Sequence, residues 1–74
     1  MKKIVASMAG TVIEVLVHVG DKIIVGQVVV ILESMKMEVP IEAEVAGKVS
    51  WIKVNTGDFV NEDDILLEVD EGNG

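Results

Sequence analysis

Hydrophobic residues alternate with polar residues over short stretches of this chain. Apolar side chains stand at every second position at Val15, Val17 and Val19, and again at Ile52 and Val54. A two-residue period is typical of half-buried β-strands. No stretch of ten residues shows the 3.6-residue period of an amphipathic helix. The pattern therefore predicts a chain built from short strands.

Glycines and changes of phase divide these strands. Matched Gly-Asp pairs stand at residues 20–21 and 57–58, and both residue types favour tight turns. The alternation changes phase within residues 12–15 and again within residues 49–52. An extra residue in one strand produces such a change, so we expect a β-bulge or bend at each place.

The chain also contains an internal repeat of 37 residues. When residues 4–32 are aligned without gaps on residues 41–69, eight positions are identical and several more exchange one apolar residue for another. The identical pairs are Ile4/Ile41, Ala6/Ala43, Ala9/Ala46, Gly10/Gly47, Val12/Val49, Val17/Val54, Gly20/Gly57 and Asp21/Asp58. Two copies are too few for a solenoid. We expect two half-domains that close on one core around a pseudo-twofold axis.

These patterns predict an all-β fold, a flattened eight-stranded barrel or sandwich of two four-stranded sheets. Half of the residues are apolar, mostly valine, isoleucine and leucine, a bias that favours strands. A chain of 74 residues allows one domain, expected at residues 1–70, with residues 71–74 as a flexible tail.

Composition excludes several classes of function. Cysteine is absent, which removes disulfides and thiolate metal sites. The formal net charge is −7, and residues 39–74 carry all of it because residues 1–38 sum to zero. Such a balance disfavours nucleic-acid binding. Without an apolar run of 18 residues or a signal peptide, we expect a cytoplasmic protein that is monomeric when isolated.

The stretch ESMKMEVP, residues 33–40, joins two strand-like runs, 28–34 and 37–45. Only Met35 and Lys36 stand between them, which predicts a two-residue hairpin turn of type I′ or II′. These turns favour Asn-Gly because φ is positive, and other residues cost roughly 1–3 kcal/mol each and cluster at functional sites. Because the hairpin links the two repeats, we expect it to protrude and to lie on or near the pseudo-twofold axis.

The motif ESMKME resembles the attachment motif of biotinyl domains, in which a lysine between two methionines is modified. ASMAG, residues 6–10, resembles the opening motif of that family, with Ser7 where proline is common, and residues 17–38 resemble its approach to the lysine. The resemblance covers residues 4–69. Lipoyl domains share the fold but usually carry Asp-Lys-Ala at the turn, so the two methionines favour biotin.

The resemblance implies a biotin carboxyl carrier, similar to small free-standing biotin/lipoyl attachment proteins and without the inserted thumb of some carriers. A biotin protein ligase would acylate Lys36 from a biotinyl adenylate, and the arm would carry carboxyl groups between a biotin carboxylase and a carboxyltransferase. The chain would not be an enzyme by itself, with no catalytic residues and no metal. The ligase would recognise the residues around the lysine, namely Glu33, Ser34, Met35, Met37 and Glu38.

Two alternatives stay open. One is a lipoyl carrier, or a dual acceptor of biotin and lipoate, with Lys36 modified by a lipoyl ligase. The other is an unmodified β-barrel interaction module in which Lys36 is an ordinary solvated lysine. Other candidates have structural interpretations: His18 as a solvent-facing strand residue, residues 62–64 as a solvated turn, and Trp51 and Phe59 as packing residues.

The repeat also exposes an asymmetry. Several apolar residues of the first half have polar counterparts in the second half: Ile13/Ser50, Leu16/Lys53, Ile24/Asn61, Val25/Glu62 and Ile31/Glu68. The symmetry predicts that both members of a pair occupy equivalent, outward positions. One hypothesis is that the apolar face of the first half docks partner enzymes; the alternative is drift between the two copies.

Overall fold

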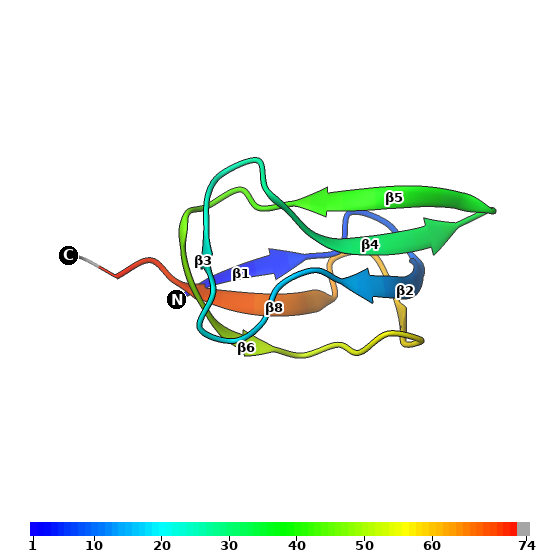
Figure 1. Cartoon of the computed structure of the whole chain (residues 1–74). Coiled ribbons are helices and arrows are strands. Elements are labelled where there is room, and N and C mark those ends of the chain that lie inside the picture. Colours follow the sequence, from blue (N-terminus) through cyan, green and yellow to red (C-terminus); the bar gives the residue numbers. More distant parts are fainter. Residues whose placement is uncertain (73–74) are drawn as a thin grey trace.

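Residues 1–72 of the computed structural model are described, and they form two four-stranded antiparallel sheets (Figure 1). The strands are β1 (Lys2–Val5), β2 (Gly10–Val15), β3 (Lys22–Ile23), β4 (Val28–Ser34), β5 (Met37–Glu42), β6 (Gly47–Ile52), β7 (Phe59–Val60) and β8 (Ile65–Asp70). The sheets have the orders β1-β8-β6-β3 and β5-β4-β2-β7. The predicted all-β fold is confirmed. Within the described part of the chain, no helix has the length and apolar character needed to cross a membrane.

The internal repeat is a symmetry of the fold. Strands β5 to β8 are the counterparts of β1 to β4, and exchanging them converts one sheet order into the other. Each sheet therefore takes two strands from each half of the chain. The pairing register is interrupted between Val12 and Glu14 in β2, and between Val49 and Trp51 in β6. Both predicted bulges are thus confirmed, at equivalent places.

The hairpin between β4 and β5 lies at one end of an elongated molecule, and the start of β1 and the end of β8 lie at the other end (Figure 1). The principal extents are 41 × 19 × 18 Å. By the symmetry, this hairpin corresponds to the paired ends of β8 and β1. The pseudo-twofold axis therefore crosses the long axis between the two ends. The prediction that the hairpin protrudes is right, but the prediction that it lies on or near the axis is wrong.

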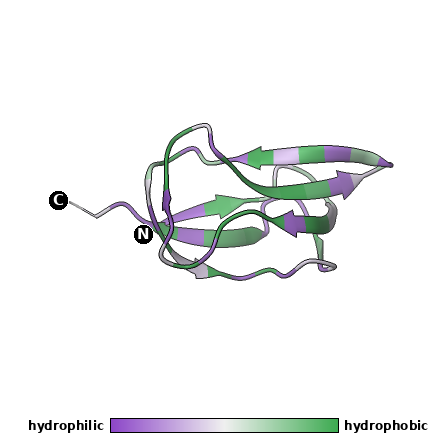
Figure 2. Ribbon diagram, viewed as in Figure 1, coloured by the Kyte–Doolittle hydropathy of each residue, from purple (hydrophilic) through white to green (hydrophobic). Residues whose placement is uncertain are grey.

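The hydrophobic core obeys the same symmetry. Its sixteen buried apolar residues form eight pairs separated by 37 positions: Ile4/Ile41, Ala6/Ala43, Val12/Val49, Val17/Val54, Ile23/Val60, Val29/Leu66, Val30/Leu67 and Leu32/Val69. The strands that enclose it carry mostly hydrophobic residues, interrupted by hydrophilic ones (Figure 2). Each fully buried valine or leucine contributes roughly 1.5–3 kcal/mol. Both halves therefore contribute equally to one core.

The alternating run after β2 is not a strand over its whole length. Strand β2 ends at Val15, and Val19 is 61% exposed. The chain turns because the His18 N–H donates to Asp21 Oδ2 over 2.8 Å, and the Asp21 N–H donates to the His18 carbonyl over 3.0 Å. His18 is exposed, as expected, but in a turn rather than in a strand. A side-chain cap on the backbone has overridden the alternation.

Strand β5 is also shorter than the predicted run 37–45, because it ends at Glu42. The Ala43 N–H donates to the Gln27 carbonyl, and the Ala43 carbonyl accepts from the Gly26 N–H, both over 2.8 Å. These bonds fix the chain against the turn after β3. Ala43 nevertheless belongs to the core.

The connections between strands are short. Within residues 1–72 the longest are six residues, at 16–21 and 53–58, so this part of the chain has no inserted thumb. The predicted tail falls partly outside the described residues: Glu71 and Gly72 follow β8, and residues 73–74 are not described.

Candidate functional site

The candidate site is the turn between β4 and β5. Met35 and Lys36 have φ values of 53° and 65°, and the closing pair is Ser34 and Met37. Positive φ at both central residues is the type I′ conformation, one of the two predicted types. Neither residue is the glycine or asparagine that such turns favour. Such a local mismatch costs stability, and residues held in this way cluster at functional sites.

The Lys36 side chain is exposed at the very end of the molecule. Met35 is 90% exposed and Met37 is 68% exposed. Methionines at such exposure add little to the core, and their soft, flexible side chains suit contact with a partner. The tip thus presents one amine between two apolar side chains.

Charge at the tip is also locally unfavourable. Glu33 and Glu38 are directly opposed on β4 and β5, and like charges in such positions destabilise a hairpin. No lysine within residues 1–72 lies close enough to a carboxylate to form an ion pair. The Lys36 amine is therefore not held by a carboxylate of the described residues.

Strand β2 supports the hairpin at its base. Thr11 is paired with Glu33, and the neighbouring Gly10 lies against the Glu33 backbone. A Cβ added to Gly10 would stand 2.7 Å from the Glu33 carbonyl oxygen. The absence of a side chain at Gly10 is thus what lets β2 approach β4 where the hairpin leaves the barrel.

The residues predicted to be read by a ligase all lie at this tip. Ser34 is half-buried, and the other four, Glu33, Met35, Met37 and Glu38, are exposed beside Lys36. A protein surface approaching the tip would meet all of them together. Their role in recognition stays a prediction, because their placement alone does not test it.

Phe59 is a residue whose position the sequence did not predict. It was expected to pack, but it is 66% exposed, and Trp51 is 46% exposed. Phe59 is paired with Thr11, which is paired on its other side with Glu33. It therefore belongs to the row of residues that reaches the hairpin. The polar counterpart of Phe59 in the repeat, Lys22, was the signal that this position faces solvent.

The acidic residues 62–64 form a solvated turn, as predicted. The Asn61 N–H donates to Asp64 Oδ2 over 2.8 Å. Asp63 has a φ of 72°, and its counterpart Gly26 has a φ of 90°. The Asp64 carboxylate thus caps the backbone of the turn.

The pairs that differ in polarity between the halves occupy equivalent positions. Leu16, Ile24 and Val25 are exposed like their polar counterparts, whereas Ile13 and Ile31 are half-buried like theirs. The prediction of outward positions therefore holds for three pairs and is only partly met in two.

The arrangement suits a carrier of a covalently bound group. Within residues 1–72 no polar or charged side chain is buried. What the barrel offers is a primary amine on a narrow, rigid hairpin. An amine can form an amide bond with an activated carboxyl group, and biotin has a free carboxyl group. The Lys36 amine is therefore suited to carrying biotin.

Comparisons with known proteins agree with this geometry. The family described as "Biotin-requiring enzyme" matches residues 2–69. The chain is 56% identical over 62 residues to the biotin/lipoyl attachment protein of Bacillus subtilis, covering 84% of this chain and 85% of that one. It is 48% identical over 64 residues to the biotin carboxyl carrier protein of Streptococcus mutans, covering 86% of this chain and 49% of that one.

A solved structure shares the fold. Part of the urea carboxylase of Kluyveromyces lactis superimposes with a TM-score of 0.86 at 29% identity, covering 92% of this chain and 6% of the carboxylase. The fold places an exposed lysine in a hairpin turn, and the family matches nearly the whole chain. This chain therefore belongs to the biotin/lipoyl attachment family.

Proposed function

We propose that this chain is a biotin carboxyl carrier and that Lys36 is its attachment residue. The observation that carries the proposal is the position of Lys36, exposed and unpaired at the tip of a strained type I′ hairpin, at one end of the molecule. The names of two similar proteins, a biotin/lipoyl attachment protein and a biotin carboxyl carrier protein, point the same way.

Attachment requires an activated acyl donor from a separate enzyme. A lysine amine is largely protonated at neutral pH and is then not nucleophilic, so a biotin protein ligase would supply both a base and biotinyl adenylate. The deprotonated Lys36 nitrogen attacks the acyl carbon and forms the amide bond. The bond from that carbon to the phosphate oxygen breaks, AMP leaves with the electron pair, and the nitrogen releases its remaining extra proton.

The shape of the hairpin makes this reaction possible in a partner's active site. Two strands and a two-residue turn form a narrow projection, and the turn geometry is fixed on both sides by strand pairing. A ligase pocket can therefore enclose Lys36 together with Met35 and Met37 without contacting the barrel. Glu33, Ser34 and Glu38 at the base complete the surface that we expect the ligase to recognise.

Once attached, biotin supplies a ureido nitrogen that accepts and releases a carboxyl group. The barrel holds the arm at one end of a rigid body, and tethering replaces diffusion by a high local concentration at each active site. Similar domains occur inside urea carboxylase, so we infer that the partners are the biotin carboxylase and carboxyltransferase of such a system.

The experiment uses protein purified from its native host. Intact mass, with parallel streptavidin and anti-lipoate blots, identifies the group on the chain. A biotin-sized adduct that maps to Lys36 supports the proposal, and a lipoyl-sized adduct there would assign the chain to acyl or aminomethyl transfer instead. No adduct, with a fully functional Lys36→Gln variant, would indicate an unmodified interaction module.

A further inference from the structure

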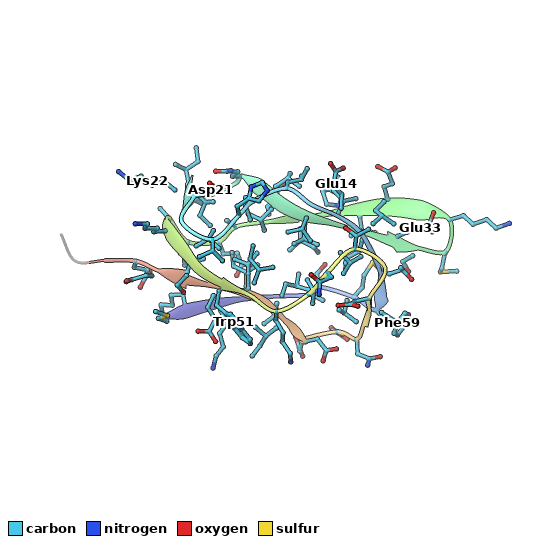
Figure 3. The ribbon with its side chains drawn as sticks, turned by 60° about the horizontal axis from the view of Figure 1, so that its bottom comes forward. Glu14, Asp21, Lys22, Glu33, Trp51 and Phe59 are labelled. Carbon is cyan, nitrogen blue, oxygen red and sulfur yellow. The ribbon has the colours of Figure 1, made fainter. Side chains whose placement is uncertain are left out.

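The exposed face of the second sheet carries a row of residues that leads from the hairpin to Phe59. The register places Glu38, Glu33, Thr11 and Phe59 side by side on β5, β4, β2 and β7. Directly opposed residues of antiparallel strands project to the same face. Because Leu32, one position before Glu33, is buried, this row faces solvent. Figure 3 shows Glu33 and Phe59 at the same end of the molecule as the hairpin.

The fold does not require an aromatic ring at this position. Phe59 is 66% exposed, and its counterpart Lys22 begins the equivalent two-residue strand β3 with a charged side chain. The other described aromatic residue, Trp51, belongs to the other sheet and lies further from the hairpin end (Figure 3). Phe59 is therefore an apolar surface that is left open beside the attachment site.

A biotinyl arm on Lys36 is long enough to reach this surface. Glu33 and Phe59 are two strand spacings apart, roughly 10 Å, and Lys36 lies three residues beyond Glu33, about 10 Å along the strand. The diagonal is thus on the order of 14 Å. About eleven bonds connect the lysine Cα to the bicycle of biotin, and at roughly 1.3 Å of advance per bond they span that diagonal.

The chemistry of the two groups is complementary. One edge of the bicycle is a thioether ring, and sulfur makes favourable contacts with aromatic side chains. The polar ureido edge can stay in water or face the carboxylate of Glu33. The contact is intramolecular once the arm is attached, so even a weak interaction is populated at the effective concentration of a short tether.

We propose that Phe59 is a resting site for the biotin bicycle, on which the arm folds back along the Glu33–Thr11–Phe59 row when no partner holds it. The inference rests on the proposed attachment at Lys36. In this barrel, which has no inserted thumb within residues 1–72, Phe59 then covers the bicycle. Partner active sites then compete with Phe59 for the arm.

The test uses isotope-labelled full-length protein that is biotinylated in vitro by a purified biotin protein ligase, and NMR of the product. We expect NOEs between the Phe59 ring and the bicycle, and upfield shifts of the bicycle protons from the ring current. The Phe59→Lys variant, which copies the residue at the equivalent position of the first half, should lose both signals and keep the fold. The matched control Trp51→Glu, which copies Glu14, should retain both.

The outcomes separate this inference from the proposed function. A biotinylated protein without NOEs to Phe59, or with unchanged bicycle shifts in Phe59→Lys, overturns the resting site and leaves the carrier function standing. If the bicycle makes no contact and Phe59→Lys instead slows ligation, Phe59 belongs to the ligase contact surface, which also overturns the resting site. If no biotin protein ligase modifies Lys36, both the resting site and the carrier function are overturned.

Discussion

At the level of single residues, Met35 and Lys36 stand in turn positions that other residue types would fill at lower cost. Both have positive φ, a conformation that asparagine and glycine adopt at much lower cost. The proposed attachment at Lys36 accounts for this strain, because it requires an amine at the tip with apolar side chains next to it. The same tip also carries the opposed carboxylates Glu33 and Glu38, so three unfavourable features coincide at one place.

Replacing Met35 by asparagine should therefore make the domain more stable and a poorer substrate for its ligase. We expect Met35→Asn to raise the free energy of unfolding by about 1 kcal/mol, because asparagine tolerates a left-handed backbone. Urea denaturation measures the stability, and single-turnover biotinylation measures the loss of recognition. Met37→Asn, in a strand position, is the control and should bring no gain in stability. A less stable Met35→Asn protein would show that the turn is not strained.

At the scale of elements, the base of the hairpin depends on the close approach of β2 to β4. A Cβ at Gly10 would stand 2.7 Å from the Glu33 carbonyl oxygen, and a Cβ at Gly47 would stand 2.5 Å from the Asp70 carbonyl oxygen. These two glycines are counterparts in the repeat. One contact lies beside the attachment hairpin, and the other lies at the opposite end of the barrel.

Substituting these two glycines separates the effect of displacing the hairpin from the effect of lowering the stability of the domain. Gly10→Ala and Gly47→Ala should each destabilise the domain by about 1–3 kcal/mol through overpacking. Only Gly10→Ala should also slow biotinylation, because only this substitution displaces β4, the strand that contains Glu33 and leads into the hairpin. Thermal unfolding and ligation rates, measured below the unfolding transition, provide the comparison. Equal slowing by both substitutions would mean that ligation responds to stability alone.

The elements also show what could be predicted from sequence. The repeat and the turn residues were sufficient to predict an eight-stranded all-β fold and the hairpin, and the changes of phase predicted the two bulges, because a bulge shifts the side-chain parity that the pleat fixes. The end of β2 was not predicted because it depends on the hydrogen bond from the His18 N–H to the Asp21 carboxylate. Such a contact leaves no trace in the alternation of apolar and polar residues. The place of the hairpin relative to the axis was missed because it depends on β1 pairing with β8, which links the two ends of the chain.

The residues of the candidate site also differ in whether they could be predicted from the sequence. Lys36 and its neighbours could be found from a contiguous motif and from the wrong residues in a tight turn. Phe59 could not, because it reaches the hairpin only through the pairing of β7 with β2 and of β2 with β4. Thr11 and Gly10 join the site by the same cross-strand route. A single sequence shows such neighbours only when the sheet order is known.

At the scale of the whole molecule, the two halves are interdependent. Each sheet contains strands from both halves, and all eight core pairs lie in one hydrophobic cluster. The hairpin that carries Lys36 lies at the opposite end of a 41 Å body from the start of β1 and the end of β8. The lysine can therefore enter a partner's active site while the rest of the barrel stays outside it.

This interdependence predicts the behaviour of fragments. Residues 1–36 and 37–74 as separate peptides should each lack a cooperative fold, because neither can complete a four-stranded sheet or cover its apolar face. Circular dichroism should show no stable β-structure in either peptide, and equimolar mixing at high concentration should restore it. A half that unfolds cooperatively on its own would refute the shared core.

We expect biotin on Lys36 and on no other lysine of the chain. The most direct measurement is the intact mass of the purified chain after reaction with a biotin protein ligase, biotin and ATP, followed by peptide mapping. Lys36→Arg keeps the charge and lacks the reactive amine, and Lys48→Arg, on β6 of the other sheet, is the matched control. We predict one biotin on the wild-type chain and on Lys48→Arg, mapped to Lys36, and none on Lys36→Arg. A biotin on Lys36→Arg, or none on the wild-type chain, would contradict the account.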